Sequence, residues 1–127
     1  MSMDNNINRD TGNEILERLR EAGVDVKDLT GRLMNNMNLI TRFVRRFPDD
    51  MSYKQLVDSI DKGDVEEAFR AAHTLKGVTA NLSMTKLYRL LCEQVEFLRA
   101  GDMEAGADMM PAITEEYESM VAAIENI

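Results

Sequence analysis

The sequence is poor in the residues that build disulfide-bonded or membrane-spanning proteins. Of its 127 residues, one is cysteine, two are proline and none is tryptophan. A single cysteine cannot form an internal disulfide, which favours a reducing, cytoplasmic setting. No apolar run approaches the roughly 18 residues that a membrane-spanning helix needs, and the N-terminus has no signal-peptide pattern. We therefore expect a cytoplasmic protein that does not enter a membrane.

Basic residues are also in the minority. The chain has 15 Lys and Arg against 23 Asp and Glu, which gives a formal net charge of -8. Unspecific nucleic-acid binding needs a basic surface, so this balance argues against a nucleic acid as partner. Apolar residues make up 44% of the chain, and its length fits one compact domain that buries a core without disulfides.

Helical periodicity predicts most of the local structure. Residues 1–12 are polar and aperiodic, and we expect a flexible tail there, with the domain covering residues 13–127. A short amphipathic helix is expected to stop near Gly23, and Asp25 could cap a further turn. Pro48 is expected to end or bend the next helix. The apolar stripes of the longer helices span residues 33–47, 53–60, 65–82, 87–98 and 109–124.

Turn and cap residues separate these helical segments. Residues 61–64 (DKGD) predict a turn in which Asp64 caps the next helix and Glu67 completes a capping box. Ser83 is expected to cap the following helix. No stretch shows the alternation of a strand. The sequence therefore predicts an all-α protein, an antiparallel up-down four-helix bundle with one or more short additional N-terminal helices.

The one chemically unusual feature is His73, the only histidine in the chain. On a helix with about 100° per residue, it lies more than about 100° from the centre of the apolar stripe, so it should face solvent. Lys76, one turn later, could bring a cation to an anion held on the imidazole. Gly77 costs a helix about 1 kcal/mol relative to alanine but clears space beside His73. Phe69, one turn earlier, would add an apolar contact.

An exposed imidazole with a neighbouring cation and open space suits a nucleophile that attacks phosphorus. On spacing alone, a surface histidine without function is an equally good interpretation. Residues 73–82 (HTLKGVTANL), however, resemble the bacterial branch of the histidine-containing phosphotransfer domain family. That family carries an H-x-x-K-G signature on an inner helix of a four-helix bundle. The resemblance extends from about Glu14 to the C-terminus.

The resemblance implies a role for several residues. His73 would be phosphorylated on Nε2, Lys76 would stabilise the phosphoryl group, and Gly77 would give the partner room. A polar residue on the neighbouring helix often supports the histidine in this family, and Glu96 and Gln94 are the candidates here. The expected docking surface comprises Phe69, Arg70 and Ala80, with Arg42, Arg45 and Arg46 either as a basic rim or as ordinary solvated charges. The family usually has glycine at the position of Ser83 and a small residue at that of Met84.

The resemblance also implies the partners. These would be response-regulator receiver domains and a sensor or hybrid histidine kinase, with Mg²⁺ bound by the receiver and no cofactor or metal on this chain. The sequence has no P-loop or other nucleotide-binding pattern, so we expect a monomeric phosphoryl carrier and not a kinase. The alternatives are a non-phosphorylated helical adaptor that binds a receiver or kinase domain, a purely structural domain, and a metal or haem site using His73 with a methionine or Cys92, for which the ligand spacing is poor.

Overall fold

The computed structural model describes the backbone of residues 9–127, and every regular element in that range is a helix. The predicted all-α fold class is therefore confirmed. None of these helices is both long and apolar enough to cross a membrane. The elements in chain order are α1 (Arg9–Glu21), α2 (Val26–Arg32), α3 (Met37–Arg45), the 3₁₀ turn η2 (Phe47–Asp49), α4 (Ser52–Lys62), α5 (Val65–Asn81), α6 (Thr85–Arg99), α7 (Met103–Asp108) and α8 (Met110–Glu125).

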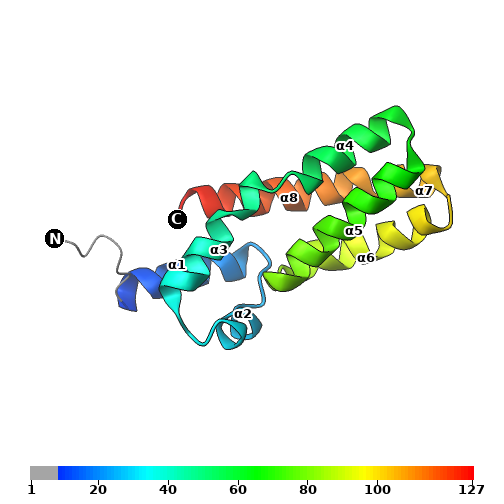
Figure 1. The fold of residues 1–127 in the computed structure, drawn as a ribbon. Helices are drawn as coiled ribbons and strands as arrows, with labels where there is room; N and C mark the ends of the chain where they lie inside the picture. The colour runs from blue at the N-terminus through cyan, green and yellow to red at the C-terminus, as the bar shows by residue number, and fades with distance from the viewer. Residues whose placement is uncertain (1–8) are drawn as a thin grey trace.

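The bundle consists of α4, α5, α6 and α8. Helix α5 packs along α4 on one side and α6 on the other, and α6 in turn packs against α7 and α8 (Figure 1). Helices α1, α2 and α3 gather at the end of the molecule opposite α7, and α1 and α3 contact α8 there. Helix α5 thus has neighbours on two sides and keeps one long face free for solvent.

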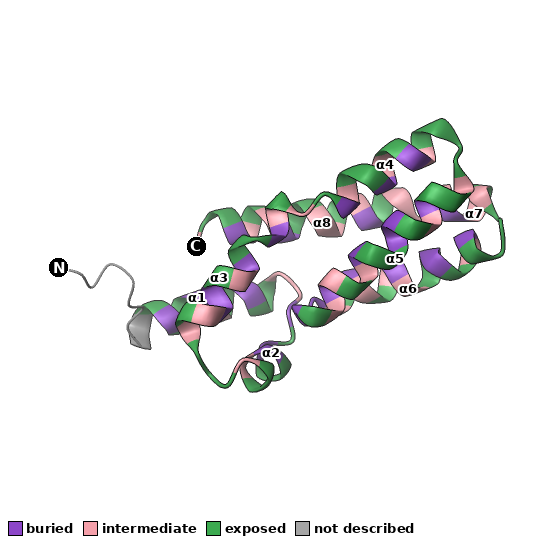
Figure 2. Ribbon diagram, in the orientation of Figure 1, coloured by how far each residue is buried: buried purple, intermediate pink, exposed green. Residues whose placement is uncertain are grey.

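The core follows the apolar stripes that the sequence predicts (Figure 2). Each helix of the bundle turns its apolar stripe inward, because burial of apolar surface is the main favourable term in folding. Side chains that are at most 1% exposed come from η2 and from every bundle helix: Phe47, Leu56, Ala68, Ala72, Leu75, Leu87, Leu91, Val95, Ile113 and Met120.

The caps around α5 fix where this helix begins. Gly63 ends α4. It adopts φ 72°, which glycine reaches without a Cβ clash. The Asp64 carboxylate then accepts a hydrogen bond of 3.1 Å from the Glu67 N–H, as predicted. The second half of the predicted capping box is absent, because the Glu67 carboxylate pairs with Arg70 instead. Asp25 likewise caps α2, through the N–H of Asp28.

Two other boundaries bear on the sequence prediction. The predicted tail over residues 1–12 is wrong for residues 9–12, which belong to α1, while residues 1–8 lie outside the described part. Gly12 is buried against α3, where a Cβ would come within 3.2 Å of Met37 Cγ. A tertiary contact therefore extends this helix beyond what its polar local sequence predicts. Pro48 behaves as predicted: α3 ends before it and α4 begins after it.

Ser83 does not cap α6 as predicted. Its backbone is left-handed, with φ 55°, and the residue at the cap position is Met84. The Ser83 hydroxyl instead donates to Asp28 Oδ2 at 2.7 Å, and its carbonyl accepts a 2.8 Å bond from the Asp25 N–H. The turn after α5 is thereby attached to the start of α2.

Candidate functional site

His73 lies in the middle of α5, on the face that the bundle leaves open. The helix buries Ala68, Ala72 and Leu75, and the imidazole is exposed. The predicted exposure of His73 is confirmed. Within the described residues, the imidazole has no hydrogen-bond or ion-pair partner, so both of its ring nitrogens are free for chemistry.

Phe69 is the side chain that restrains the imidazole. The ring centroids of Phe69 and His73 are 5.9 Å apart, and the ring planes differ by 17°. This offset, nearly parallel arrangement is one that aromatic rings prefer. Phe69 is itself half-buried, whereas the imidazole is exposed.

Lys76 and Gly77 lie on the following turn. Lys76 is half-buried, and no carboxylate of the described residues pairs with its ammonium group. Gly77 is exposed, and a Cβ at this position would have no atom within 4 Å apart from its chain neighbours and its own helix backbone. Helix packing therefore does not require glycine here. The site combines a free imidazole, an unneutralised cation one turn away and open space, and Ala80, which is half-buried, adds a further small side chain.

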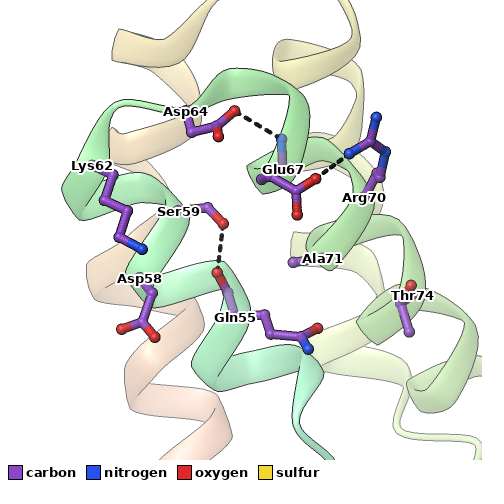
Figure 3. A pocket seen from close by; sticks show the side chains of 9 residues that line it. All are labelled: Gln55, Asp58, Ser59, Lys62, Asp64, Glu67, Arg70, Ala71 and Thr74. Carbon is purple, nitrogen blue, oxygen red and sulfur yellow. Dashed lines mark hydrogen bonds and ion pairs between the residues drawn. The ribbon is translucent and has the colours of Figure 1, made fainter.

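A polar pocket between α4 and α5 lies beside this face (Figure 3). Thr74, the residue after His73, lines it from α5. Arg70 also lines it, but its guanidinium pairs with Glu67 and, at 4.0 Å, with Glu66. The charge of Arg70 is thus largely satisfied within its own helix. The other residues that line the pocket are Gln55, Asp58, Ser59, Lys62, Asp64 and Ala71.

On the other side of α5, the last turn of α6 reaches the site through Arg99. The Arg99 guanidinium carbon is 5.0 Å from the centroid of the Phe69 ring, within the range of a cation–π contact. The Nε of Arg99 also lies 3.3 Å from Glu96 Oε1. A shallow second pocket is lined by Phe69 and Arg99 together with Val65, Glu66, Arg70, Leu98 and Gly101.

Neither residue predicted to support His73 bonds to it in this structure. Gln94 is fully buried and donates to the Gly106 carbonyl at 3.0 Å and to Met110 Sδ at 3.1 Å, so it joins α6 to α7 and α8. Glu96 is exposed and pairs with Arg99. Glu96 therefore reaches His73 only indirectly, through Arg99 and Phe69.

The family model of the Hpt domain matches residues 9–126, nearly the whole chain. The chain belongs to the Hpt domain family. Hpt domains are phosphotransfer modules of two-component and chemotaxis signalling and are not themselves kinases.

One curated protein is similar over part of this Hpt domain. It is the chemotaxis protein CheA of Bacillus subtilis (strain 168), which is 37% identical over 73 residues. The match covers 55% of this chain and 11% of CheA, so the chain spans about a tenth of the length of that protein. The comparison with solved structures gave no significant match.

The arginines predicted as a possible basic rim make no contact with His73 among the described residues. Of the three arginines of the α3 region, Arg45 donates to the Ile127 carbonyl at 3.0 Å, and the Arg46 guanidinium lies 5.5 Å from the ring centroid of Phe43. Arg42 is exposed on α3. Among the described residues, no three His, Cys, Asp or Glu side chains gather as metal ligands.

Arg99 is the residue of this Hpt domain site that sequence reasoning missed. It lies 26 residues after His73, at the end of a different helix, and resembles an ordinary basic residue near a helix C-terminus. The only signal in the sequence was its spacing from Tyr88, Cys92 and Val95, which places all four on one edge of α6. The sequence alone does not show that this edge of α6 lies beside α5.

Proposed function

We propose that this Hpt domain accepts a phosphoryl group on Nε2 of His73 and passes it on, exchanging it with the aspartates of receiver domains. The observation that carries the proposal is the environment of His73: an exposed imidazole that the described residues leave free of hydrogen bonds, with Lys76 unpaired among them and open space at Gly77. Membership of the family supplies the type of chemistry.

The transfer is a displacement at phosphorus. The lone pair of neutral Nε2 attacks the aspartyl phosphate of the receiver. The new N–P bond forms as the O–P bond breaks, and the aspartate leaves as a carboxylate. The proton of the imidazole stays on Nδ1, and the reverse reaction regenerates the free histidine. Positioning and neutralisation of the phosphoryl oxygens dominate such a step.

Each residue of the site has a part in this proposal. Lys76 neutralises negative charge on the phosphoryl oxygens through charge-assisted hydrogen bonds. Gly77 lets the receiver bring its acidic pocket close to the imidazole. Mg²⁺ belongs to the receiver, and the chain needs no cofactor of its own. The phosphoryl group originates from a sensor or hybrid histidine kinase, and the exchange takes place in the cytoplasm.

The test is to mix the purified chain with a receiver domain that has been phosphorylated by a small donor and to measure the intact mass. We expect one added phosphoryl group that is labile in acid and stable in base, the behaviour of a phosphoramidate. The chain has a single histidine, so loss of this group in His73→Gln assigns it to His73. Receivers that bind the chain but never transfer a phosphoryl group would replace this function with that of an adaptor.

A further inference from the structure

The orientation of His73 depends on a chain of contacts that begins on α6. Glu96 pairs with Arg99, and the Arg99 guanidinium lies over the Phe69 ring at 5.0 Å. The Phe69 ring lies 5.9 Å from the imidazole of His73 in a nearly parallel arrangement. Because the described residues give the imidazole no hydrogen bond, these ring contacts are the restraint that the structure provides.

We infer that Arg99 is a positioning residue for phosphoryl transfer, acting through Phe69 to hold the imidazole of His73 in the orientation that presents Nε2 to its partner. The inference rests on the proposed function of His73. It assigns the support of the histidine to a cation on an aromatic ring, in place of the polar side chain of Gln94 or Glu96 that the sequence resemblance implies.

The geometry explains why such a device suits an exposed histidine. A hydrogen bond from the imidazole to a carboxylate would occupy a ring nitrogen and compete with water. A ring contact leaves both nitrogens free and restricts only the side-chain torsions. Arg99 lies in the last turn of a well-packed helix, next to the buried Leu98, so its position is set by the bundle. Glu96 limits the range over which the guanidinium moves.

The first test measures the imidazole directly by NMR. The chain contains one histidine, so the two carbon-bound ring protons need no assignment against other histidines. The nearby Phe69 ring should displace their signals through its ring current. We expect Phe69→Leu to remove this displacement and Arg99→Gln to reduce it. Arg99→Lys, which keeps a cation over the ring, should preserve it.

The second test measures the rate at which phosphoramidate phosphorylates the chain. In this reaction an N–P bond to Nε2 of His73 forms as the N–P bond of the donor breaks, and ammonia leaves. This small donor needs no docking surface, so the rate reports the histidine itself. Arg99→Gln should slow the reaction about two- to fivefold, the factor that corresponds to an exposed cation–π contact. Arg99→Lys should restore the rate. Arg89→Gln is the matched control, because Arg89 is exposed on the same helix and has no ion pair among the described residues.

The outcomes separate this inference from the proposed function. A wild-type chain that never accepts a phosphoryl group from phosphoramidate or from any receiver overturns both. A wild-type chain that is phosphorylated, with an Arg99→Gln variant whose rate and imidazole signals equal those of the wild type, overturns the role of Arg99 alone. An equal loss in Arg89→Gln would show that the rate follows overall charge and would also overturn it.

Discussion

At the scale of single residues, Gly77 is the clearest sign that α5 serves more than packing. A Cβ at this position would meet no side chain beyond its chain neighbours and no other helix within 4 Å, and the helix would gain from it. A glycine in the interior of a helix costs about 1 kcal/mol relative to alanine. The helix thus carries a destabilising residue one turn from His73, on its exposed face, as the proposed clearance for a partner requires.

We therefore predict opposite effects of Gly77→Ala on stability and transfer. The free energy of unfolding, measured by urea denaturation, should rise by about 1 kcal/mol, while transfer from a phosphorylated receiver should slow. Gly31→Ala is the matched control, because Gly31 is also exposed on a helix and a Cβ there would have no other atom within 4 Å. It should stabilise the chain without affecting transfer. Unchanged transfer in Gly77→Ala would contradict the clearance argument.

Lys76 provides the second prediction at this scale. Its ammonium has no carboxylate partner among the described residues, so it is available to the phosphoryl oxygens. Lys76→Gln should slow phosphorylation of His73 roughly ten- to hundredfold, since hydrogen bonds to charged groups contribute about 1.5–3 kcal/mol and about 1.4 kcal/mol is a factor of ten. Lys27→Gln, which removes an exposed charge from α2, should have no effect. Equal rates for Lys76→Gln and the wild type would exclude Lys76 from the chemistry.

At the scale of elements, the connection between α2 and the end of α5 depends on Ser83. Its hydroxyl binds Asp28, and its backbone occupies the left-handed region with φ 55°. That conformation costs a residue with a Cβ roughly 1–2 kcal/mol, which gives a physical reason for the glycine that the family resemblance leads us to expect there. The hydrogen bond to Asp28 offsets part of this strain.

Two substitutions separate the strain from the hydrogen bond. Ser83→Ala keeps the Cβ and loses the hydroxyl, so it should lower the melting temperature. Ser83→Gly also loses the hydroxyl, but it relieves the strain of the left-handed backbone, which favours it over the alanine variant by about 1 kcal/mol. The greater chain entropy of glycine in the unfolded state reduces this advantage. Thermal unfolding by circular dichroism measures both. An alanine variant at least as stable as the glycine variant would contradict this account of the turn.

The same contact predicts an acid-sensitive part of stability. The Ser83 hydroxyl, followed by the Arg32 guanidinium, holds the pKa of the Asp28 carboxyl below its ordinary value of 3.8. A carboxyl whose pKa is depressed by folding stabilises the protein above its ordinary pKa, and this contribution is lost as the pH falls through the lowered value. The difference in the free energy of unfolding between the wild type and Asp28→Asn, measured by urea denaturation, should therefore be largest near neutral pH and shrink below about pH 3.8. A difference that does not change with pH would contradict this role of the carboxylate.

The sequence predicted those elements whose signals are local. The stripe of Ala68, Ala72, Leu75 and Thr79 identifies α5 and leaves His73 exposed, because helical periodicity depends on spacing alone. Three features required tertiary contacts and were not predictable: the start of α1, where Gly12 packs on Met37; the left-handed turn at Ser83; and the contact of Arg99 with Phe69.

At the scale of the whole molecule, one face of α5 packs in the core of the bundle and the opposite face is open to solvent. The inner face of α5 is enclosed by α4 and α6 and is built from small and aliphatic side chains. The outer face carries His73, Lys76 and Gly77, none of which is fully buried. The side chains on the outer face can therefore be altered without unfolding the domain.

The most direct test of this account compares the wild type with His73→Gln. Both chains are incubated with a phosphorylated receiver, their intact masses are measured, and their folding is followed by circular dichroism. We predict that the wild type gains one acid-labile phosphoryl group, whereas His73→Gln gains none and keeps the helical spectrum and melting temperature of the wild type. A His73→Gln variant that still accepts the phosphoryl group, or that unfolds, would contradict the assignment of His73 as an exposed phosphoryl carrier.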